Sequence, residues 1–180
     1  MKNFHELAAL RQSDRAYLPT PVEKEKLERI LETVRIAPSA CNAQPWKFIV
    51  VDNPELKNQI ADATSSRVLG MNHFTKQAPI HIVVIEEKAN FTSNFGAWAK
   101  NTHYPHIDLG IAASYLCLAA TEEGLGTCMI GWFDEKKIKK LLGIPRDKKV
   151  LLVITLGYPA QDTRVKKRKT IEEIISKNHY

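Results

Sequence analysis

The side chains best suited to hold a flat heteroaromatic ligand lie in the segment 37–51. Asn42 and Gln44 each carry an amide that both donates and accepts hydrogen bonds, and Trp46 adds a large ring at the start of an expected strand. Pro38 disfavours helical geometry at the residue before it, so a helix should end there. Small residues that would let backbone approach a ligand closely stand nearby: Ser39, Ala40 and Ala43. An ordinary helix-to-strand connection explains these residues equally well, and both interpretations stay open on chemistry alone.

Two basic segments, one near each end of the sequence, suit a bound phosphate group. Arg11, Ser13 and Arg15 place a hydroxyl donor between two permanently charged guanidinium groups. The one dense basic cluster comes near the other end: Arg164, Lys166, Lys167, Arg168 and Lys169. Arginines that only face water are the competing explanation for the first segment. A single local cluster could serve one phosphate group as easily as a nucleic acid.

The remaining reactive side chains form no recognisable catalytic or metal-binding pattern. The six histidines lack a metal-ligand spacing such as His-x-x-x-His, and no Ser/His/Asp or Cys/His set stands out. His103 and His106 are three residues apart, but the sequence shows no third ligand, so no metal site is predicted. The three cysteines are odd in number and contain no Cys-x-x-Cys pair, which fits a reducing cytoplasm better than a disulfide framework.

Length and composition indicate one soluble globular domain spanning residues 1–180, with 44% hydrophobic and 26% charged residues. No run approaches the roughly 18 apolar residues of a membrane span, and the first residues lack the apolar core of a signal peptide. We therefore expect a cytoplasmic protein without membrane contact. The net charge of +6 could attract nucleic acid, but most lysines are scattered near glutamates, as on a solvated face. Nucleic-acid binding is not predicted.

Hydrophobic patterns and capping signals predict the elements that must position these side chains. Expected helices begin after Asn3, after Thr20 with Pro21 in the first turn, at 52–55, at 106, at 135 and after Thr170. Expected strands cover 47–51, 80–85, 127–131 and 150–156, of which 80–85 reads as buried on both faces. An irregular insert from 86 to 105 carries aromatic residues that would pack at an interface or cover a ligand: Phe91, Phe95, Trp98 and Tyr104.

The pattern Pro-Ser-x-x-Asn-x-Gln-Pro-Trp at 38–46, followed by Phe-Ile-Val-Val, resembles the FMN-dependent nitroreductase family. Three further segments resemble the same family in the expected order. They are Arg-x-Ser-x-Arg at 11–15, the Asp-x-Gly-Ile-Ala-Ala and Gly-Leu-Gly-Thr-Cys segments within 108–128, and a basic pair before the last helix. The resemblance covers nearly the whole chain. Thr170 departs from it, because the family usually has a proline there.

This resemblance implies an α+β fold with a mainly antiparallel central sheet flanked by helices, in an intertwined homodimer that binds FMN at its interface. It places Arg11, Ser13, Lys166 and Arg168 around the phosphate, with Lys167 or Lys169 as alternatives in the second basic segment. Gln12 would join through backbone or side chain, and Arg15 would lie near the pyrimidine edge of the ring. The other subunit would contribute Pro38, Ser39, Ala40 and Asn42. The backbone of Ile130 and Gly131 would face flavin N5, and Asp108 would be a structural acid.

The implied activity is an NAD(P)H oxidoreductase, in which NADH or NADPH donates hydride through flavin N5 in ping-pong fashion. The acceptor would be a nitroaromatic, a quinone or a similar small molecule. A specialised relative acting on one metabolite, or on the flavin itself, is an alternative. So is a flavin-binding protein with little turnover. A basic RNA binder would be colourless and salt-sensitive, and it leaves the amides of 38–46 unexplained.

Overall fold

The computed structural model describes residues 3–66, 70–88 and 102–180. Its centre is a four-stranded sheet in the order β1-β2-β4-β3, and every neighbouring pair of strands is antiparallel. The strands are β1 (Trp46–Val51), β2 (Ile80–Glu86), β3 (Gly126–Ile130) and β4 (Lys149–Gly157). The prediction of a mainly antiparallel sheet flanked by helices is confirmed, and the four expected strands lie within a residue or two of their predicted bounds.

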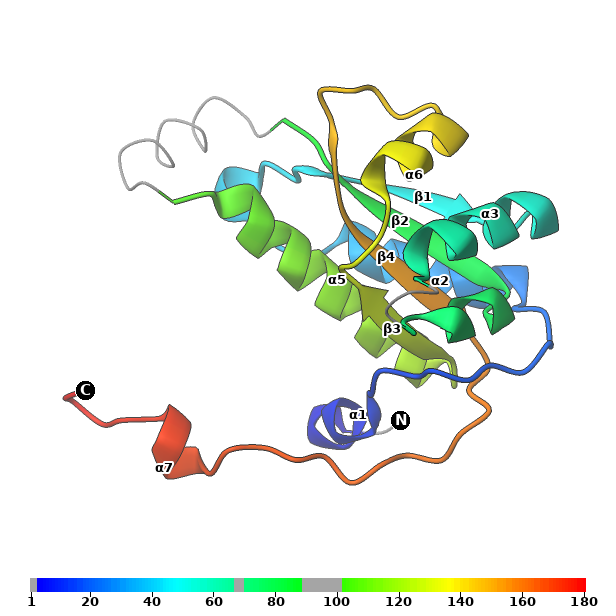
Figure 1. Ribbon diagram of the computed structural model, residues 1–180. Helices are drawn as coiled ribbons and strands as arrows, with labels where there is room; N and C mark the ends of the chain where they lie inside the picture. The colour runs from blue at the N-terminus through cyan, green and yellow to red at the C-terminus, as the bar shows by residue number, and fades with distance from the viewer. Residues whose placement is uncertain (1–2, 67–69, 89–101) are drawn as a thin grey trace.

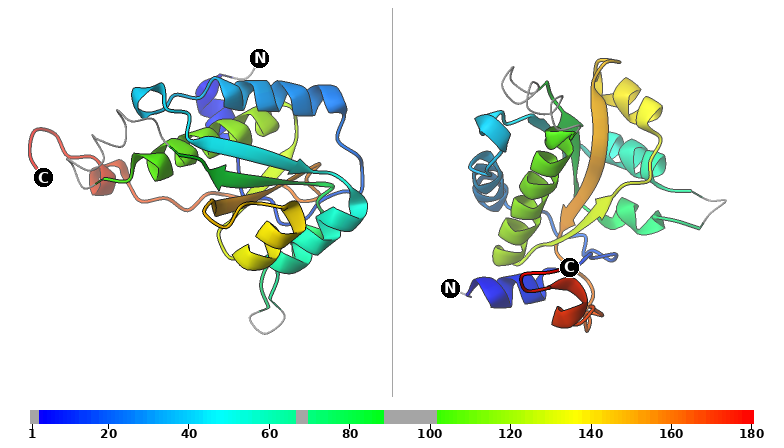
Figure 2. Two further views of the ribbon diagram at one scale, coloured as in Figure 1. Left: turned by 90° about the horizontal axis from the view of Figure 1, so that it is seen from above. Right: turned by 90° about the vertical axis from the view of Figure 1, so that its left-hand side faces the viewer.

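Helices cover both faces of the sheet (Figures 1 and 2). On one face lie α2 (Lys24–Arg35) and α5 (Tyr104–Glu122), and on the other lie α3 (Pro54–Thr64) and α6 (Glu135–Leu142). Strand β2 supplies both cores in alternation: Ile82 and Val84 pack with α2 and α5, whereas Val83 and Ile85 pack with α3 and α6. The prediction that this strand is buried on both faces is confirmed.

Capping signals fix where four helices begin, as predicted. The capping residues are Asn3 before α1 (Phe4–Leu10), Asn53 before α3, Asp134 before α6 and Thr170 before α7 (Ile171–Ile174). The predicted start of α2 after Thr20 is wrong, because the helix begins at Lys24. The N–H of Leu18 donates to the carbonyl of Tyr158, and the Tyr158 hydroxyl donates to the Glu23 carboxylate. These contacts hold the chain extended past Pro21.

Two short 3-10 turns complete the described elements, η1 (Ala40–Asn42) and η2 (His73–Gln77). After β4 the chain runs along the outside of the molecule, passes α1 and ends beyond α7, away from the sheet (Figure 1). Its apolar side chains are exposed: Val165, Ile171, Ile174 and Ile175. Three of the aromatic residues expected at an interface, Phe91, Phe95 and Trp98, lie outside the described residues. Among the described helices, none combines the length and apolar character needed to cross a bilayer.

Candidate functional site

The basic segment 11–15 lies along the free edge of β3. Ser13 pairs in parallel with Thr127, and the N–H of Asp14 donates to the Thr127 carbonyl over 2.8 Å. The Asp14 side chain turns inward and is buried, which raises the pKa of its carboxyl, although a hydrogen bond from Gln12 opposes the shift. A Cβ added to Gly126 would come within 2.5 Å of Asp14 Oδ2. Glycine at 126 is therefore what lets segment 11–15 approach the sheet.

The side chain of Gln12 fastens the C-terminal segment to this edge. Its Nε2 donates to Asp14 Oδ1 over 2.8 Å and to the Asp162 carbonyl over 3.2 Å, while its Oε1 accepts from the N–H of Arg164 over 3.0 Å. The Arg164 guanidinium in turn donates to the Ser13 carbonyl over 2.8 Å. The Gln12 amide is thus engaged in holding two distant parts of the chain together.

These contacts assemble a cavity of about 340 Å³ that we call the cationic pocket. Its lining comprises Arg11, Gln12, Ser13, Arg15, Arg164, Val165, Lys166, Lys167 and Arg168. No acidic side chain belongs to that lining, and the pKa of Lys166 is lowered by partial burial and then by the positive charges of Arg11 and Arg168. These positive charges outnumber the acid beside the pocket, Asp14, and their excess favours an anion.

The structure brings together the predicted site residues from both ends of the chain, namely Arg11, Gln12, Ser13, Arg15, Lys166 and Arg168. Arg164 also lines the cationic pocket and was not assigned to the site from the sequence, and Lys167, which the sequence left open as an alternative phosphate contact, lines it too. Both stand in the dense basic cluster. That cluster was the available signal, but which of its members face the pocket depends on the hydrogen bonds of Gln12.

The second group of predicted residues lies in the segment 38–46, here called the amide loop. Cys41, Asn42 and Gln44 all have left-handed backbone, with φ of 51°, 50° and 45°. Residues other than glycine rarely adopt this backbone conformation. Where the surrounding structure holds them in it, they are often found at functional sites. The amide loop is therefore shaped more specifically than a connection between a helix and a strand requires.

Several hydrogen bonds hold that shape. The N–H of Ala40 donates to Asp108 Oδ1 over 3.0 Å, which gives this buried acid the structural role expected for it. The N–H of Gln44 donates to the Ser39 hydroxyl over 2.9 Å, and Gln44 Nε2 donates to Asn42 Oδ1 over 3.0 Å. The side-chain amides of Asn42 and Gln44, which the sequence offered to a ligand, are thus partly engaged in hydrogen bonds within the loop.

Ile130 and Gly131, the residues expected to face a flavin through their backbone, stand where β3 ends. Ile130 is buried in the core, whereas Gly131 is exposed. A Cβ added to Gly131 would meet no atom within 4 Å, so the space beside its backbone is open in the single chain. Because segment 11–15 lies along the same strand, Gly131 and the cationic pocket share one edge of the sheet.

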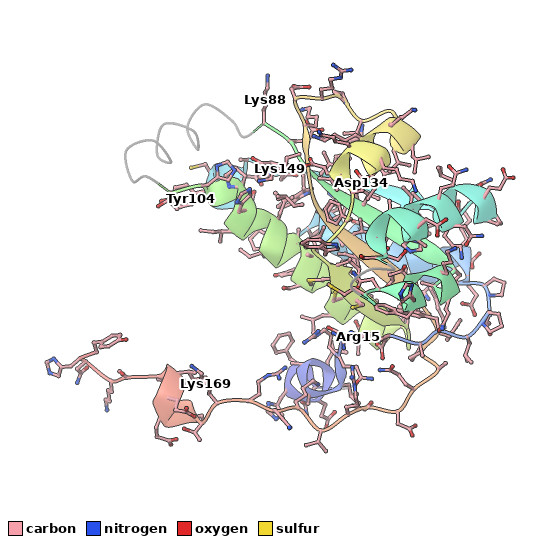
Figure 3. The ribbon with its side chains drawn as sticks, in the orientation of Figure 1. Arg15, Lys88, Tyr104, Asp134, Lys149 and Lys169 are labelled. Atoms are coloured by element: carbon pink, nitrogen blue, oxygen red, sulfur yellow. The ribbon has the colours of Figure 1, made fainter. Side chains whose placement is uncertain are left out.

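The amide loop and the cationic pocket lie at opposite ends of α5. Asp108, which anchors the loop, is in the second turn of that helix, whereas β3 and its neighbour Ser13 follow the far end of the helix. At 1.5 Å per residue, the helix alone separates the two regions by about 20 Å. In Figure 3, Tyr104 marks the start of α5 and Arg15 lies near the other end of that helix. One chain therefore does not bring Pro38, Ser39, Ala40 and Asn42 to the pocket.

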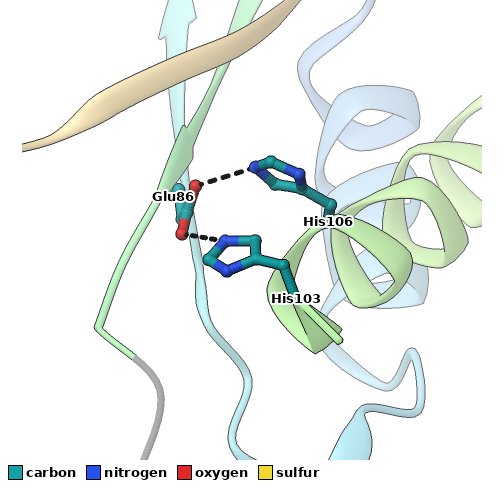
Figure 4. A group of neighbouring side chains, drawn as sticks. All are labelled: Glu86, His103 and His106. Atoms are coloured by element: carbon teal, nitrogen blue, oxygen red, sulfur yellow. Dashed lines mark hydrogen bonds and ion pairs between the residues drawn. The ribbon is translucent and has the colours of Figure 1, made fainter. Parts of the chain in front are cut away.

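A third polar group, which the sequence did not reveal, lies beside the histidine pair. Glu86, the last residue of β2, accepts hydrogen bonds from both His103 and His106 (Figure 4). The sequence offered no third ligand beside these histidines, and the structure places the Glu86 carboxylate next to both. The missing signal is tertiary, because Glu86 is separated from the pair by 17 and 20 residues.

Comparison with known proteins adds to this geometry. The sequence profile described as the nitroreductase family matches residues 8–70 and 65–158, which together make up most of the chain. The chain belongs to the nitroreductase family. Its antiparallel sheet flanked by helices is the fold of that family, as the resemblance of the four motifs predicted.

Several known proteins resemble the chain over most of its length. Iodotyrosine deiodinase 1 of Rattus norvegicus is 26% identical, covering 97% of this chain and 69% of the relative. A putative NADH dehydrogenase/NAD(P)H nitroreductase of Archaeoglobus fulgidus is 30% identical, covering 84% and 83%. The solved FMN-dependent nitroreductase of Clostridium difficile is 30% identical with a TM-score of 0.77, covering 97% and 98%. These relatives support an oxidoreductase.

Proposed function

We propose that this protein is an FMN-dependent NAD(P)H oxidoreductase that acts as a homodimer on nitroaromatic, quinone or similar small acceptors. The observation that carries the proposal is the cationic pocket, where both ends of the chain converge on a space suited to one phosphate group. FMN, when bound, would supply two-electron chemistry, accepting hydride from NAD(P)H and passing electrons to the acceptor. The protein would supply binding, orientation and charge.

Each group in the cationic pocket has a distinct part in this proposal. Arg11, Lys166 and Arg168 would hold the phosphate through charge-assisted hydrogen bonds, with the Ser13 hydroxyl as a neutral donor. Arg15 would place a fixed positive charge beside the ring and so stabilise the negative charge of the reduced flavin. Gln12 would act chiefly by holding the C-terminal segment in place, since its amide already bonds Asp162 and Arg164.

The remainder of the site would come from a second copy of the chain, which would bring Pro38, Ser39, Ala40 and Asn42 to the pocket. An apolar hollow of about 580 Å³ along α5 supports this arrangement. Its lining includes Phe4, Leu7, Ile107, Ile111, Tyr115 and Leu118. Phe4 and Ile107 are 72% and 52% exposed, which is unusual for large apolar side chains unless another surface covers them. The exposed isoleucines around α7 offer further apolar contact.

Purification of the protein tests the proposal directly. We expect a yellow protein that releases FMN on denaturation, identified by its absorbance and mass. Anaerobic addition of NADH or NADPH should bleach the colour, and a nitroaromatic or quinone should restore it. A colourless protein that takes up no added FMN would overturn the assignment. A yellow protein that neither nucleotide bleaches would indicate a flavin-binding protein with little turnover.

The similarity to iodotyrosine deiodinase 1 favours a second candidate, a specialised reductase of one halogenated metabolite. In such a reaction two electrons and a proton replace a carbon–iodine bond by a carbon–hydrogen bond, and iodide leaves. Iodotyrosine supplied to the reduced protein should then yield tyrosine and iodide in equal amounts. Turnover of iodotyrosine at a higher kcat/KM than any nitroaromatic or quinone would favour this function over the first.

A further inference from the structure

We propose that Glu86, His103 and His106 form a binding site for one divalent transition-metal ion of the zinc type. Figure 4 shows the three side chains converging from two elements, the end of β2 and the start of α5. Their ligand atoms all lie within 4.8 Å of one another, and no other such group occurs among the described residues. Two imidazoles and one carboxylate are a donor set that zinc and related ions bind in proteins.

The geometry is close to what a metal ion requires. His103 Nε2 lies 2.7 Å from Glu86 Oε1, and His106 Nε2 lies 3.2 Å from Glu86 Oε2. Ligands of a tetrahedral zinc ion at its usual bond lengths are about 3.4 Å apart. The second contact already has nearly that spacing, whereas the first is about 0.7 Å shorter. To admit an ion, His103 and Glu86 would have to move apart by about that much, and the ion would take the place of the Nε2 protons. The positions left open would be filled by water.

The three ligands are held in place and yet remain accessible. The Glu86 side chain is only 18% exposed, and it ends a strand that is buried along most of its length. His103 stands directly before the first residue of α5 and His106 follows about one turn later, so the two side chains lie on the same side of the helix. Between them Pro105 is buried and fixes the first turn. The imidazoles are 54% and 45% exposed, which leaves a route for a hydrated ion.

The surrounding charges limit the expected affinity. The cluster opens into a hollow of about 450 Å³, whose lining also contains Glu87, Lys88, Asp147, Lys148 and Lys149. The Lys148 ammonium is paired with the Glu87 carboxylate. The three lysines outnumber the two further acids of this lining, Glu87 and Asp147, and the excess positive charge disfavours a cation. Binding in the micromolar range is therefore expected, rather than the much tighter binding of a closed structural site.

The metal would act on the amide loop. Glu86 lies opposite Trp46 in the sheet, and the N–H of Glu87 donates to the Pro45 carbonyl over 3.0 Å. A metal bound to Glu86 and to both histidines would connect the strand next to the amide loop with the helix that anchors the loop through Asp108. The proposed ion is thus a structural clamp, separate from the cationic pocket.

Titration of the full-length protein with Zn²⁺ against a chromophoric chelator tests this site. One ion per chain should bind with a dissociation constant of about 10 µM or tighter, and the midpoint of thermal unfolding should rise by a few degrees. The double variant His103→Ala/His106→Ala should bind at least about 100-fold more weakly, and Glu86→Gln about 10-fold more weakly. The matched control His5→Ala/His73→Ala removes two exposed histidines elsewhere and should leave binding unchanged.

Two further measurements separate the site from its competitors. Cys41→Ser removes an exposed thiol that could itself capture zinc, and binding should survive it. Co²⁺ should give a visible absorption band that the double histidine variant abolishes. Loss of binding in Cys41→Ser, binding unchanged in His103→Ala/His106→Ala, or a dissociation constant weaker than about 10 µM would overturn the proposal. In the last case the three residues form only a hydrogen-bonded cluster.

Discussion

The cationic pocket and the amide loop differ in what holds them. The pocket consists of long charged side chains on two exposed segments, positioned largely by the single amide of Gln12. The loop consists of left-handed backbone anchored to the buried acid Asp108. The cationic pocket therefore offers positive charge on side chains with little fixed geometry. The amide loop offers a fixed backbone geometry and carries no net charge. A phosphorylated ring needs both, and a single chain keeps them at opposite ends of α5.

This contrast explains why the proposed site depends on two copies of the chain. Within one chain the path from the amide loop to the cationic pocket runs along α5, whose outer side is apolar and exposed at Ile107. Pairing two chains across that side would cover it and could bring each loop to the partner's pocket. The contrast therefore makes separate predictions for the interface, for the pocket and for the loop.

The largest effect is expected from Ile107→Glu. A carboxylate placed in the covered interface of each subunit would be buried without a partner, at a cost of about 3–5 kcal/mol each. The protein should sediment as a folded monomer, and FMN should be lost together with the dimer. Leu18→Glu, at another exposed apolar position, should change neither property. A monomer that retains FMN would contradict the proposal that two chains complete the site, because one chain would then contain all of it.

The double variant Arg11→Ala/Arg168→Ala tests the pocket without disturbing the interface. Loss of a charge-assisted phosphate contact should weaken FMN binding by about 1.5–3 kcal/mol for each arginine. Equilibrium dialysis against FMN measures the effect, and sedimentation should show an intact dimer. Arg35→Ala is the matched control, because this exposed arginine pairs with Glu32 on α2, away from the cationic pocket. Equal FMN retention in the double variant and in the control would contradict the role of the cationic pocket.

The sequence predicted the sheet and most helix starts because those signals are local. Short apolar runs and capping pairs such as Asn3 with Glu6 act within a few positions of each other. The start of α2 was missed because a residue far along the chain, Tyr158, holds Glu23 and the segment before it. A local capping signal at Thr20 could not reveal that contact.

The site shows the same limit. The residue types of the pocket could be predicted from the sequence, because Arg11 and Arg15 flank the Ser13 hydroxyl and the basic residues of 164–169 are closely spaced. The choice of Arg164 as a lining residue was not readable, because it depends on the hydrogen bond from its N–H to Gln12. Glu86 beside the histidines was also hidden, because the sheet and α5 bring it there. Residue types reveal possible chemistry, whereas tertiary contacts decide which residues take part.

Acid stability tests the sheet that carries both the pocket and the loop. His81 on β2 is fully buried, and neither ring nitrogen has a hydrogen bond of good geometry in the described part of the chain. Burial, then the nearby Lys57 ammonium, lowers its pKa from 6.5 to about 4, and the Thr75 backbone opposes this weakly. The unfolded chain therefore binds the proton first. The free energy of unfolding should fall as pH decreases from about 6.5 to 4, by about 3 kcal/mol from this residue.

Urea unfolding of the wild type and of His81→Leu across this pH range measures the contribution. The difference between the two proteins should change with pH over that window and stay constant above it. Equal pH slopes would show that His81 does not titrate in this way. If FMN is released at a pH where the sheet remains folded, the weakness lies in the pocket or the loop rather than in their shared support.

The smallest effect is expected at the anchor of the amide loop. Asp108→Ala removes the acceptor of the Ala40 N–H, at a cost near the lower end for a charged hydrogen bond, about 1.5 kcal/mol. The low end applies because Asp108 Oδ2 is buried without a hydrogen bond among the described residues, so its removal relieves some cost. Asp108→Asn can keep the bond to Ala40 and should recover most of the loss. FMN affinity should follow the same order while the dimer persists. An alanine variant with unchanged FMN affinity would show that the amide loop keeps its shape without Asp108. The loop would then not be distinguished from the cationic pocket by an anchor to a buried acid.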